Sequence, residues 1–333
     1  MAGAYNIVME SRKELVDKIV AMMKQGQVIT PDSWDRQALR PYNPLSGVQY
    51  KGGNRMRLME AVITHEYTDP RWGTFRQFKE KGYYPKKGEH GILCEKWIFE
   101  KEVKKKDNTG KEIKVVEELR KPIVSYFKVF NGEQIQDFPK FEPRQMEAGE
   151  LSGVIEELMA VSECPIKEYA QERAFYRPSE DRIYLPLRSY FIDEASFAKI
   201  LLHEMGHSTG HPSRLNREFG LEFGSPTYAK EELCAELGAL FTEIDLGISL
   251  DGEHYQSHSN YLASWIGALE NDYNELFRAC AEAEKISGRI VGNYIRILNK
   301  EITGFKEEIS ERKELAIKPD AAVASRPYVR KGR

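Results

Sequence analysis

Two histidines and a glutamate in the second half of the chain have the spacing of a zinc-binding helix. His203 and His207 lie four residues apart, and Glu204 directly follows the first of them. On a helix this spacing places both imidazoles on one face, where they can occupy two corners of a zinc tetrahedron. Glu204 can then reach a water in the open coordination position and act as its general base. The motif therefore predicts a zinc site of the metallopeptidase type.

The residues on either side of the motif also favour a helix. Phe197, Ile200 and Leu201 supply apolar side chains to the preceding turns, and Gly210 follows as a helix stop. One zincin pattern takes its third ligand from a histidine beyond this glycine, but Ser213 occupies that position. His211 is near, although it follows the residue that should end the helix.

A second zincin pattern takes the third ligand from a glutamate on a later helix. Glu232 and Glu236 lie one turn apart there, beside an apolar stripe that packs the helix inward. We expect Glu232 to bind the metal and Glu236 to hold a ligand histidine, while Glu236 or His211 as the ligand remain alternatives. Glu231 and Glu243 are expected on the solvated face of this helix.

The length and composition of the chain suggest two domains. The chain has 333 residues, 41% of them hydrophobic, which is enough for a substantial core. We find neither a signal peptide nor an apolar run long enough to span a membrane, so we expect a cytoplasmic protein. Its four cysteines are far apart and are expected to be reduced and buried.

Charge is divided unevenly along the chain. Residues 1–140 hold 26 Lys and Arg against 19 Asp and Glu, a formal charge of +7, whereas the remainder carries −10. A basic first half is a reason to consider a polyanionic partner, although basic surfaces are often only solvated surfaces.

The expected architecture is α+β. The first domain, residues 1–140, should combine helices with a small antiparallel sheet whose hairpin turns at residues 107–110. A linker at 141–153 precedes a mostly helical second domain with a short sheet, 154–315, and a disordered tail, 316–333. Helices are expected at 10–25, 54–65, 75–81 (capped by Thr74), 154–161, 194–207, 229–244 and 260–300, and strands at 92–103, 113–130, 174–176 and 182–186.

Several sequence segments together resemble the ArdC-type antirestriction proteins. In the second half these are residues 203–215, 228–236 and 175–186, and in the first half 43–50, 72–77, 86–91 and 127–135. The resemblance extends to about residue 295. The chain departs from it at Ser208, where the family often has an aromatic residue, and in a longer basic hairpin from Glu100 to Lys121.

This resemblance implies an N-terminal domain that binds single-stranded DNA and a C-terminal zincin-like metallopeptidase domain. Such proteins are carried by mobile elements, for example conjugative plasmids, and protect incoming DNA from restriction. Single-strand binders combine positive charge with aromatic faces on which bases stack. The expected DNA-binding residues are Arg55, Arg57, Trp72, Arg76, Lys86 and Lys87, whereas Phe75 is expected in the core.

Two other functions remain open. In the first alternative, the protein is a cytoplasmic zinc metallopeptidase whose first domain binds protein rather than DNA. In the second alternative, it is a binding protein whose zinc is structural. Two histidines and one glutamate leave a coordination position for water, whereas structural zinc usually has four protein ligands. The ligand set therefore favours an enzyme, with a protein as its possible substrate.

Overall fold

The protein is described by a computed structural model. It describes residues 3–25, 37–106, 108, 111–143, 150–220, 225–248 and 259–317, and for residues 150, 259–262 and 300–317 it describes the backbone alone. Among these residues, no helix is both long and apolar enough to cross a membrane.

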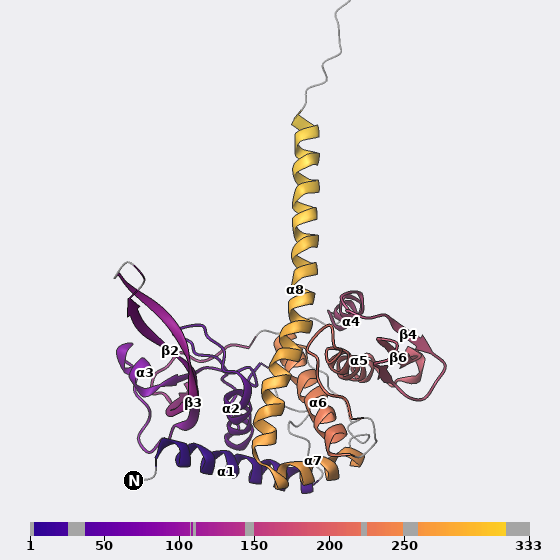
Figure 1. The fold of residues 1–333 in the computed structure, drawn as a ribbon. Coiled ribbons are helices and arrows are strands. Elements are labelled where there is room, and N and C mark those ends of the chain that lie inside the picture. The colour runs from indigo at the N-terminus through magenta and orange to yellow at the C-terminus, as the bar shows by residue number, and fades with distance from the viewer. Residues whose placement is uncertain are drawn as a thin grey trace, which may run out of the picture.

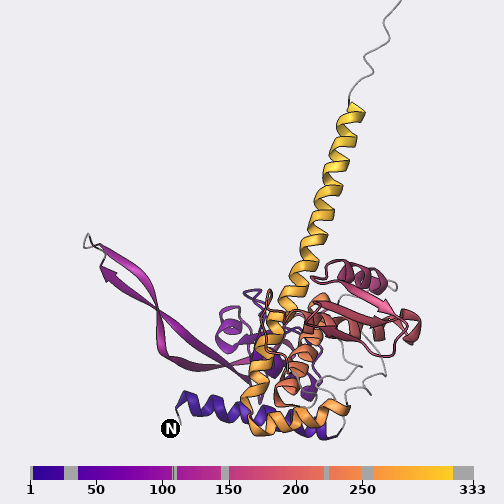
Figure 2. The ribbon, with the colours of Figure 1, turned by 45° about the vertical axis from the view of Figure 1, so that its right-hand side comes forward.

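The N-terminal half is built from helices around a three-stranded antiparallel sheet (Figure 1). Its helices are α1 (Ala4–Lys24), α2 (Gly52–His65) and α3 (Phe75–Glu80), and its strands are β1 (Trp72–Thr74), β2 (Ile92–Lys106) and β3 (Glu112–Asn131), followed by a 3-10 turn, η1 (Gly132–Gln134). The strand order is β1-β3-β2. Thr74 caps α3 in a reciprocal capping box with Gln77, as expected. Strands β2 and β3 continue beyond the sheet as a long hairpin that leaves the body (Figure 2).

The C-terminal half is mostly helical, with a second three-stranded sheet. Its elements are α4 (Glu150–Ala160), β4 (Ile166–Tyr169), β5 (Phe175–Arg177), β6 (Arg182–Pro186), η2 (Arg188–Tyr190), α5 (Glu194–Ser208), α6 (Pro226–Leu246), α7 (Ser259–Asn271) and α8 (Asn274–Ile317). The strand order is β4-β6-β5, with β4 parallel and β5 antiparallel to β6. The α+β class is confirmed.

Two expectations about the elements were wrong. The sequence predicted one helix over 260–300, but the chain breaks between α7 and α8, where Asp272 accepts from the backbone N–H of Asn274. The helix α8 also continues beyond residue 300, into the first residues of the segment expected to be a disordered tail. The rest of that tail, 318–333, and most of the expected turn at 107–110 lie outside the described residues.

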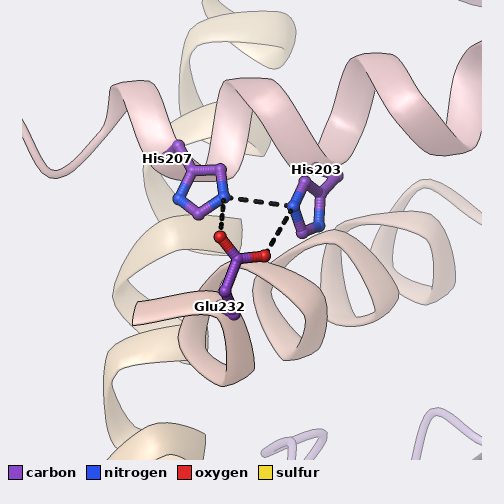
Figure 3. Close-up of side chains that lie close together, drawn as sticks. All are labelled: His203, His207 and Glu232. Atoms are coloured by element: carbon purple, nitrogen blue, oxygen red, sulfur yellow. Dashed lines mark hydrogen bonds and ion pairs between the residues drawn. The ribbon is translucent and has the colours of Figure 1, made fainter. Parts of the chain in front are cut away.

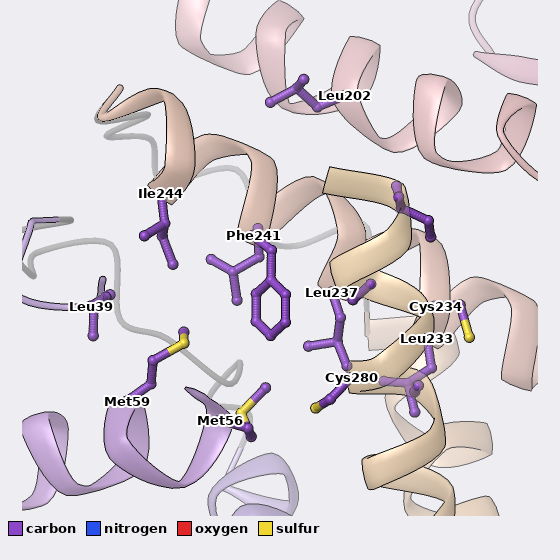
Figure 4. Close-up of a cluster of buried hydrophobic side chains, with 14 of the residues drawn as sticks. Leu39, Met56, Met59, Leu202, Leu233, Cys234, Leu237, Phe241, Ile244 and Cys280 are labelled. Carbon is purple, nitrogen blue, oxygen red and sulfur yellow. The ribbon is translucent and has the colours of Figure 1, made fainter. Parts of the chain in front are cut away.

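One hydrophobic core joins the two halves. Met56 and Met59 of α2 lie beside Phe241 of α6 (Figure 4). Leu237 of α6 and Cys280 of α8 lie on the other side of the Phe241 ring. All of these side chains are buried. The four cysteines are unpaired and buried, as expected. Neither half therefore encloses its own core completely, which matters for any experiment that separates them.

Candidate metal centre

Helix α5 presents the two histidines toward the interior. Asp193 caps the helix by accepting from the backbone N–H of Ser196 at 2.7 Å. Phe197 and Leu201 are buried under the first turns, which fixes the rotation of the helix. The Nε2 atoms of His203 and His207 consequently lie 3.1 Å apart.

Helix α6 brings the glutamate between these imidazoles. It begins at the cap Ser225, with Pro226 in its first turn. It crosses α5 closely at Gly206, where a Cβ atom would lie 3.2 Å from the carbonyl oxygen of Ala235. The close crossing places the carboxylate oxygens of Glu232 3.5 Å from the Nε2 atom of each histidine (Figure 3).

These three residues form a group that could hold one metal ion. One potential ligand atom from each of His203, His207 and Glu232 lies within 4.8 Å of the others. Two imidazole nitrogens and one carboxylate oxygen are the donor set of catalytic zinc, which keeps a fourth position for water. His211 lies outside the group, and its Nδ1 atom is 2.8 Å from the hydroxyl of Ser213.

Each histidine has a second carboxylate behind its ring. The Nδ1 atom of His203 lies 3.2 Å from Glu236, and that of His207 lies 3.1 Å from Glu231. Arg217 holds Glu231 from the other side, with its Nε and Nη2 atoms at 2.9 and 2.8 Å from the two carboxylate oxygens. Such contacts fix which ring nitrogen carries the proton and leave Nε2 to face a metal.

The structure corrects one expectation about α6. Glu231 and Glu243 were predicted on its solvated face, but their exposed fractions are 6% and 3%. Glu231 is buried because Arg217 and His207 both contact its carboxylate. The sequence gives no local signal for this, since Arg217 lies in the irregular segment between α5 and α6.

The site favours a cation between its acidic and imidazole groups. Burial would raise the pKa of Glu232, but the hydrogen bond from His203 and the charge of His207 outweigh it and lower the pKa to about 2. Burial would likewise lower the pKa of His203, but its bonds to Glu232 and Glu236 raise it well above the usual value. Without a metal ion, a proton on His203 therefore balances the negative charge of the neighbouring carboxylates. A bound metal ion would supply that positive charge instead.

Glu204 lies on the wall of a cavity that opens beside the metal group. The cavity has a volume of about 360 Å³, and Phe175, Tyr176 and Tyr228 also line it. Burial raises the pKa of Glu204, although the charges of the two histidines and the backbone N–H of Tyr176 act against this. A raised pKa suits a carboxylate that must both take up and release a proton.

The prediction of DNA binding is wrong for three of the six residues, because their side chains are buried. Arg55 is 3% exposed and pairs with Asp245 and Glu284, while Arg57 is 5% exposed and donates to Ser11. Trp72 is fully buried, so no base can stack on it.

The other three predicted DNA-binding residues are exposed. Arg76 carries an 89% exposed side chain, and Lys86 and Lys87 lie on the surface. Phe75, expected in the core, is 47% exposed and meets the 50% exposed Tyr84 edge to face at 6.5 Å.

Two family models match the chain. Residues 9–130 match the N-terminal domain of anti-restriction factor ArdC, and residues 154–282 match a zincin-like metallopeptidase. An uncharacterized protein of Sinorhizobium fredii, y4eC, is 30% identical, with 83% of this chain aligned to 89% of that protein. The crystal structure of the metal-free antirestriction ArdC protein from the R388 plasmid is 28% identical, has a TM-score of 0.66, and matches 86% of this chain and 98% of its own.

The chain belongs to the ArdC-type antirestriction family. The Mn(II)-bound structure of the R388 ArdC protein matches equally well, with a TM-score of 0.66 over 85% of this chain and 97% of its own. A DNA primase TraC of Escherichia coli is 37% identical over 82% of this chain. The match covers only 26% of that primase, so this ArdC-type chain spans about a quarter of the length of that relative.

Proposed function

We propose that this ArdC-type chain is an antirestriction protein of a mobile element that combines a zinc-dependent peptidase site with a surface for single-stranded DNA. The observation that carries the proposal is the group of His203, His207 and Glu232, with Glu204 beside it in the same cavity. A role in the cytoplasm fits the four unpaired cysteines.

The residues of the metal group fit zinc. His203, His207 and Glu232 would hold the ion, while Glu236 and Glu231 orient the two rings. A bound zinc ion acts as a Lewis acid and lowers the pKa of water. Glu204 would take the proton from the attacking water and pass it to the leaving amine. The aromatic wall of the cavity fits an apolar side chain of a peptide substrate, because apolar surface removed from water stabilises binding.

Metal binding and chemistry are separated by two substitutions. His203→Ala removes a ligand, and we expect the purified protein to lose its zinc, measured by elemental analysis. Glu204→Gln removes only the base, so zinc should stay while cleavage of a generic unfolded protein is lost. Full zinc occupancy in His203→Ala would contradict the site. Cleavage by Glu204→Gln at the wild-type rate would contradict the role of the base.

The proposed DNA surface lies around the start of α3 and the turn after it. Phe75 and Tyr84 offer two exposed aromatic faces in contact with one another. Lys86 and Lys87 follow Tyr84 by two and three residues. The turn that carries them is fixed to η1, because the backbone N–H of Lys86 donates to the carbonyl oxygen of Gln134. An aromatic platform beside exposed lysines is the combination that binds single strands without reading sequence.

Salt dependence tells a phosphate contact from a stacking contact in the full-length chain. Replacing Lys86 and Lys87 by Ala should flatten the slope of log affinity against log salt by about 0.7 per lost contact. Phe75→Ala should weaken binding by about 1–3 kcal/mol at an unchanged slope.

Two exposed residues elsewhere in the N-terminal half provide matched controls. Phe99 is a 61% exposed aromatic residue on β2, and Lys13 has a 62% exposed side chain on α1. Phe99→Ala and Lys13→Ala should leave DNA binding unchanged. Equal losses in the controls would place the DNA elsewhere. No single-strand binding at low salt would favour the alternative, in which this half binds protein.

A further inference from the structure

The second part of α8 leaves the body of the protein. Ile290, with 3% exposure, is the last buried residue of this helix among those whose side chains are described. Tyr294 donates a hydrogen bond to Glu157 of α4 at 2.7 Å. Beyond this point the helix continues to Ile317 and stands clear of the other elements in both views (Figures 1 and 2). We call residues 295–317 the stem.

A projecting helix of this length needs a partner to be stable. The stem is about 33 Å long at 1.5 Å per residue. A helix in water without tertiary packing is marginal, because its nucleation is costly and each further residue contributes little. Ile295, at the base of the stem, is 49% exposed, although Leu298, one turn further on, still lines a cavity with Val154 and Glu157 of α4.

The sequence of the stem has the repeat of a two-stranded coiled coil. From residue 295 to residue 309, large apolar residues recur at alternating spacings of three and four, at positions 295, 298, 302, 305 and 309. Ile297, Leu315 and Ile317 lie outside this repeat, and Arg312 occupies its next position. In heptad terms, isoleucine occupies the first position, a, three times, followed by Ala316, and position d is occupied by Leu298, Phe305 and, last, Arg312. The apolar seam is therefore strongest between residues 295 and 309. β-Branched residues at a with leucine at d favour two strands over three or four.

The charged positions of the repeat specify the partner and its direction. Glu301 and Glu308 occupy position g, and Lys306 and Lys313 occupy position e. In a parallel pair, g of one helix meets the following e of the other, so each glutamate would face a lysine. In an antiparallel pair, like positions meet, so glutamate would face glutamate and lysine would face lysine.

We propose that the stem forms a parallel two-stranded coiled coil with a second copy of this chain. Glu301 then pairs with the partner's Lys306, and Glu308 with the partner's Lys313. The parallel direction places both bodies at the same end of the coil. Two DNA surfaces on one assembly would raise its affinity for a long single strand above that of each surface alone.

The mass of the full-length chain in solution tests the proposal. By light scattering after gel filtration, the wild type should be a dimer whose mass falls toward that of the monomer on dilution. Ile302→Glu places a charge in the seam of each helix and should raise the dissociation constant at least about a hundredfold. Thr303→Glu introduces the same charge one position outside the seam and should leave the dimer intact. A monomeric wild type, a trimer, or a dimer that survives Ile302→Glu would each overturn the proposal.

The direction of the helices is tested separately. A variant in which Glu replaces Lys306 and Lys313 should be a monomer, because glutamate then faces glutamate across the pair. A variant in which Lys replaces Glu301 and Glu308 should also be a monomer. A mixture of the two variants should form a one-to-one dimer, because opposite charges face one another again. Ala316→Cys at position a near the end of the stem should form an intermolecular disulfide on oxidation, because the ends meet only in a parallel pair. The four native cysteines are buried, so the new thiol is the one available to react. A dimer that does not cross-link would contradict the parallel direction.

Discussion

Replacing Glu231 by Gln should weaken metal binding, although Glu231 is not one of the proposed ligands. Its carboxylate contacts His207 at 3.1 Å and Arg217 at 2.9 and 2.8 Å, and is 6% exposed. Glutamine has the same shape but one acceptor and one donor group in place of two acceptors. If its oxygen faces His207, its amide N–H₂ faces the donors of Arg217. If its oxygen faces Arg217, its amide donates to His207 and moves the ring proton to the Nε2 atom that should bind metal.

Either arrangement disturbs the contacts that orient His207, because the first loses a hydrogen bond from Arg217 to residue 231 and the second reverses the hydrogen bond with His207. Substitution of such a residue costs about 10–100-fold in metal affinity. This range corresponds to about 1.4–2.7 kcal/mol. The affinity is measured by competition with a chelator at fixed pH. Glu282→Gln on α8, which breaks a surface pair with Lys285, serves as the control and should bind zinc like the wild type.

A second substitution tests whether the weaker metal binding comes from the amide of the glutamine facing the N–H donors of Arg217. In Glu231→Gln combined with Arg217→Met, the glutamine oxygen is free to accept from His207, so this double variant should bind zinc more tightly than Glu231→Gln alone. The two losses are then not additive, as expected for residues in direct contact. Wild-type affinity in Glu231→Gln, or strictly additive losses, would refute the reasoning.

Two further predictions concern stability. Trp72→Ala should lower the free energy of unfolding by about 3–5 kcal/mol, measured by urea denaturation, because it empties a fully buried site; a change below about 1 kcal/mol would contradict its place in the core. Burial raises the pKa of Asp181, but the bonds from Arg214 and Tyr176 outweigh it, so the folded pKa lies below the unfolded value of about 3.9. Its contribution is therefore present above about pH 4 and is lost as the pH falls through the folded pKa, and Asp181→Asn should flatten acid unfolding in that range.

The metal helix could be predicted because its signals are local. The spacing of His203 and His207, the apolar residues before them and the glycine after them all lie within one short segment. The cap at Thr74 is local in the same way, since both of its hydrogen bonds close within four residues. Patterns of this kind depend on helix geometry alone.

Burial of charged residues could not be predicted in this way. Arg55 is buried because Asp245 and Glu284, far along the chain, pair with it, and its guanidinium lies 4.0 Å from the ring of Phe241. From its residue type alone, an arginine is expected on the surface, because burying an unpaired charge costs free energy. The exception requires partners that only the fold brings near. The same holds for Glu231 and its contact with Arg217.

The length of α8 was underestimated for a different reason. Up to Ile290 its apolar residues form the broad stripe of a helix packed on a core. Beyond Tyr294 the large apolar residues lie mainly at two positions in seven, with Ile297, Leu315 and Ile317 as exceptions, and most of the remainder is charged or polar. This narrower pattern resembles a solvated segment unless the repeat of seven is counted, and it is the pattern expected when the partner is a single helix.

The shared core gives α6 a role in both halves of the protein. Near its first turns α6 carries Glu232, and near its end Asp245 pairs with Arg55 of the N-terminal half. Between these points Phe241 packs against Met56 and Met59 of α2 (Figure 4). A fragment of residues 1–140 would expose this face of α2 and leave Arg55 without its acidic partners. Loss of DNA binding in such a fragment would then reflect unfolding, which is why the experiments on DNA binding and assembly require the full-length chain.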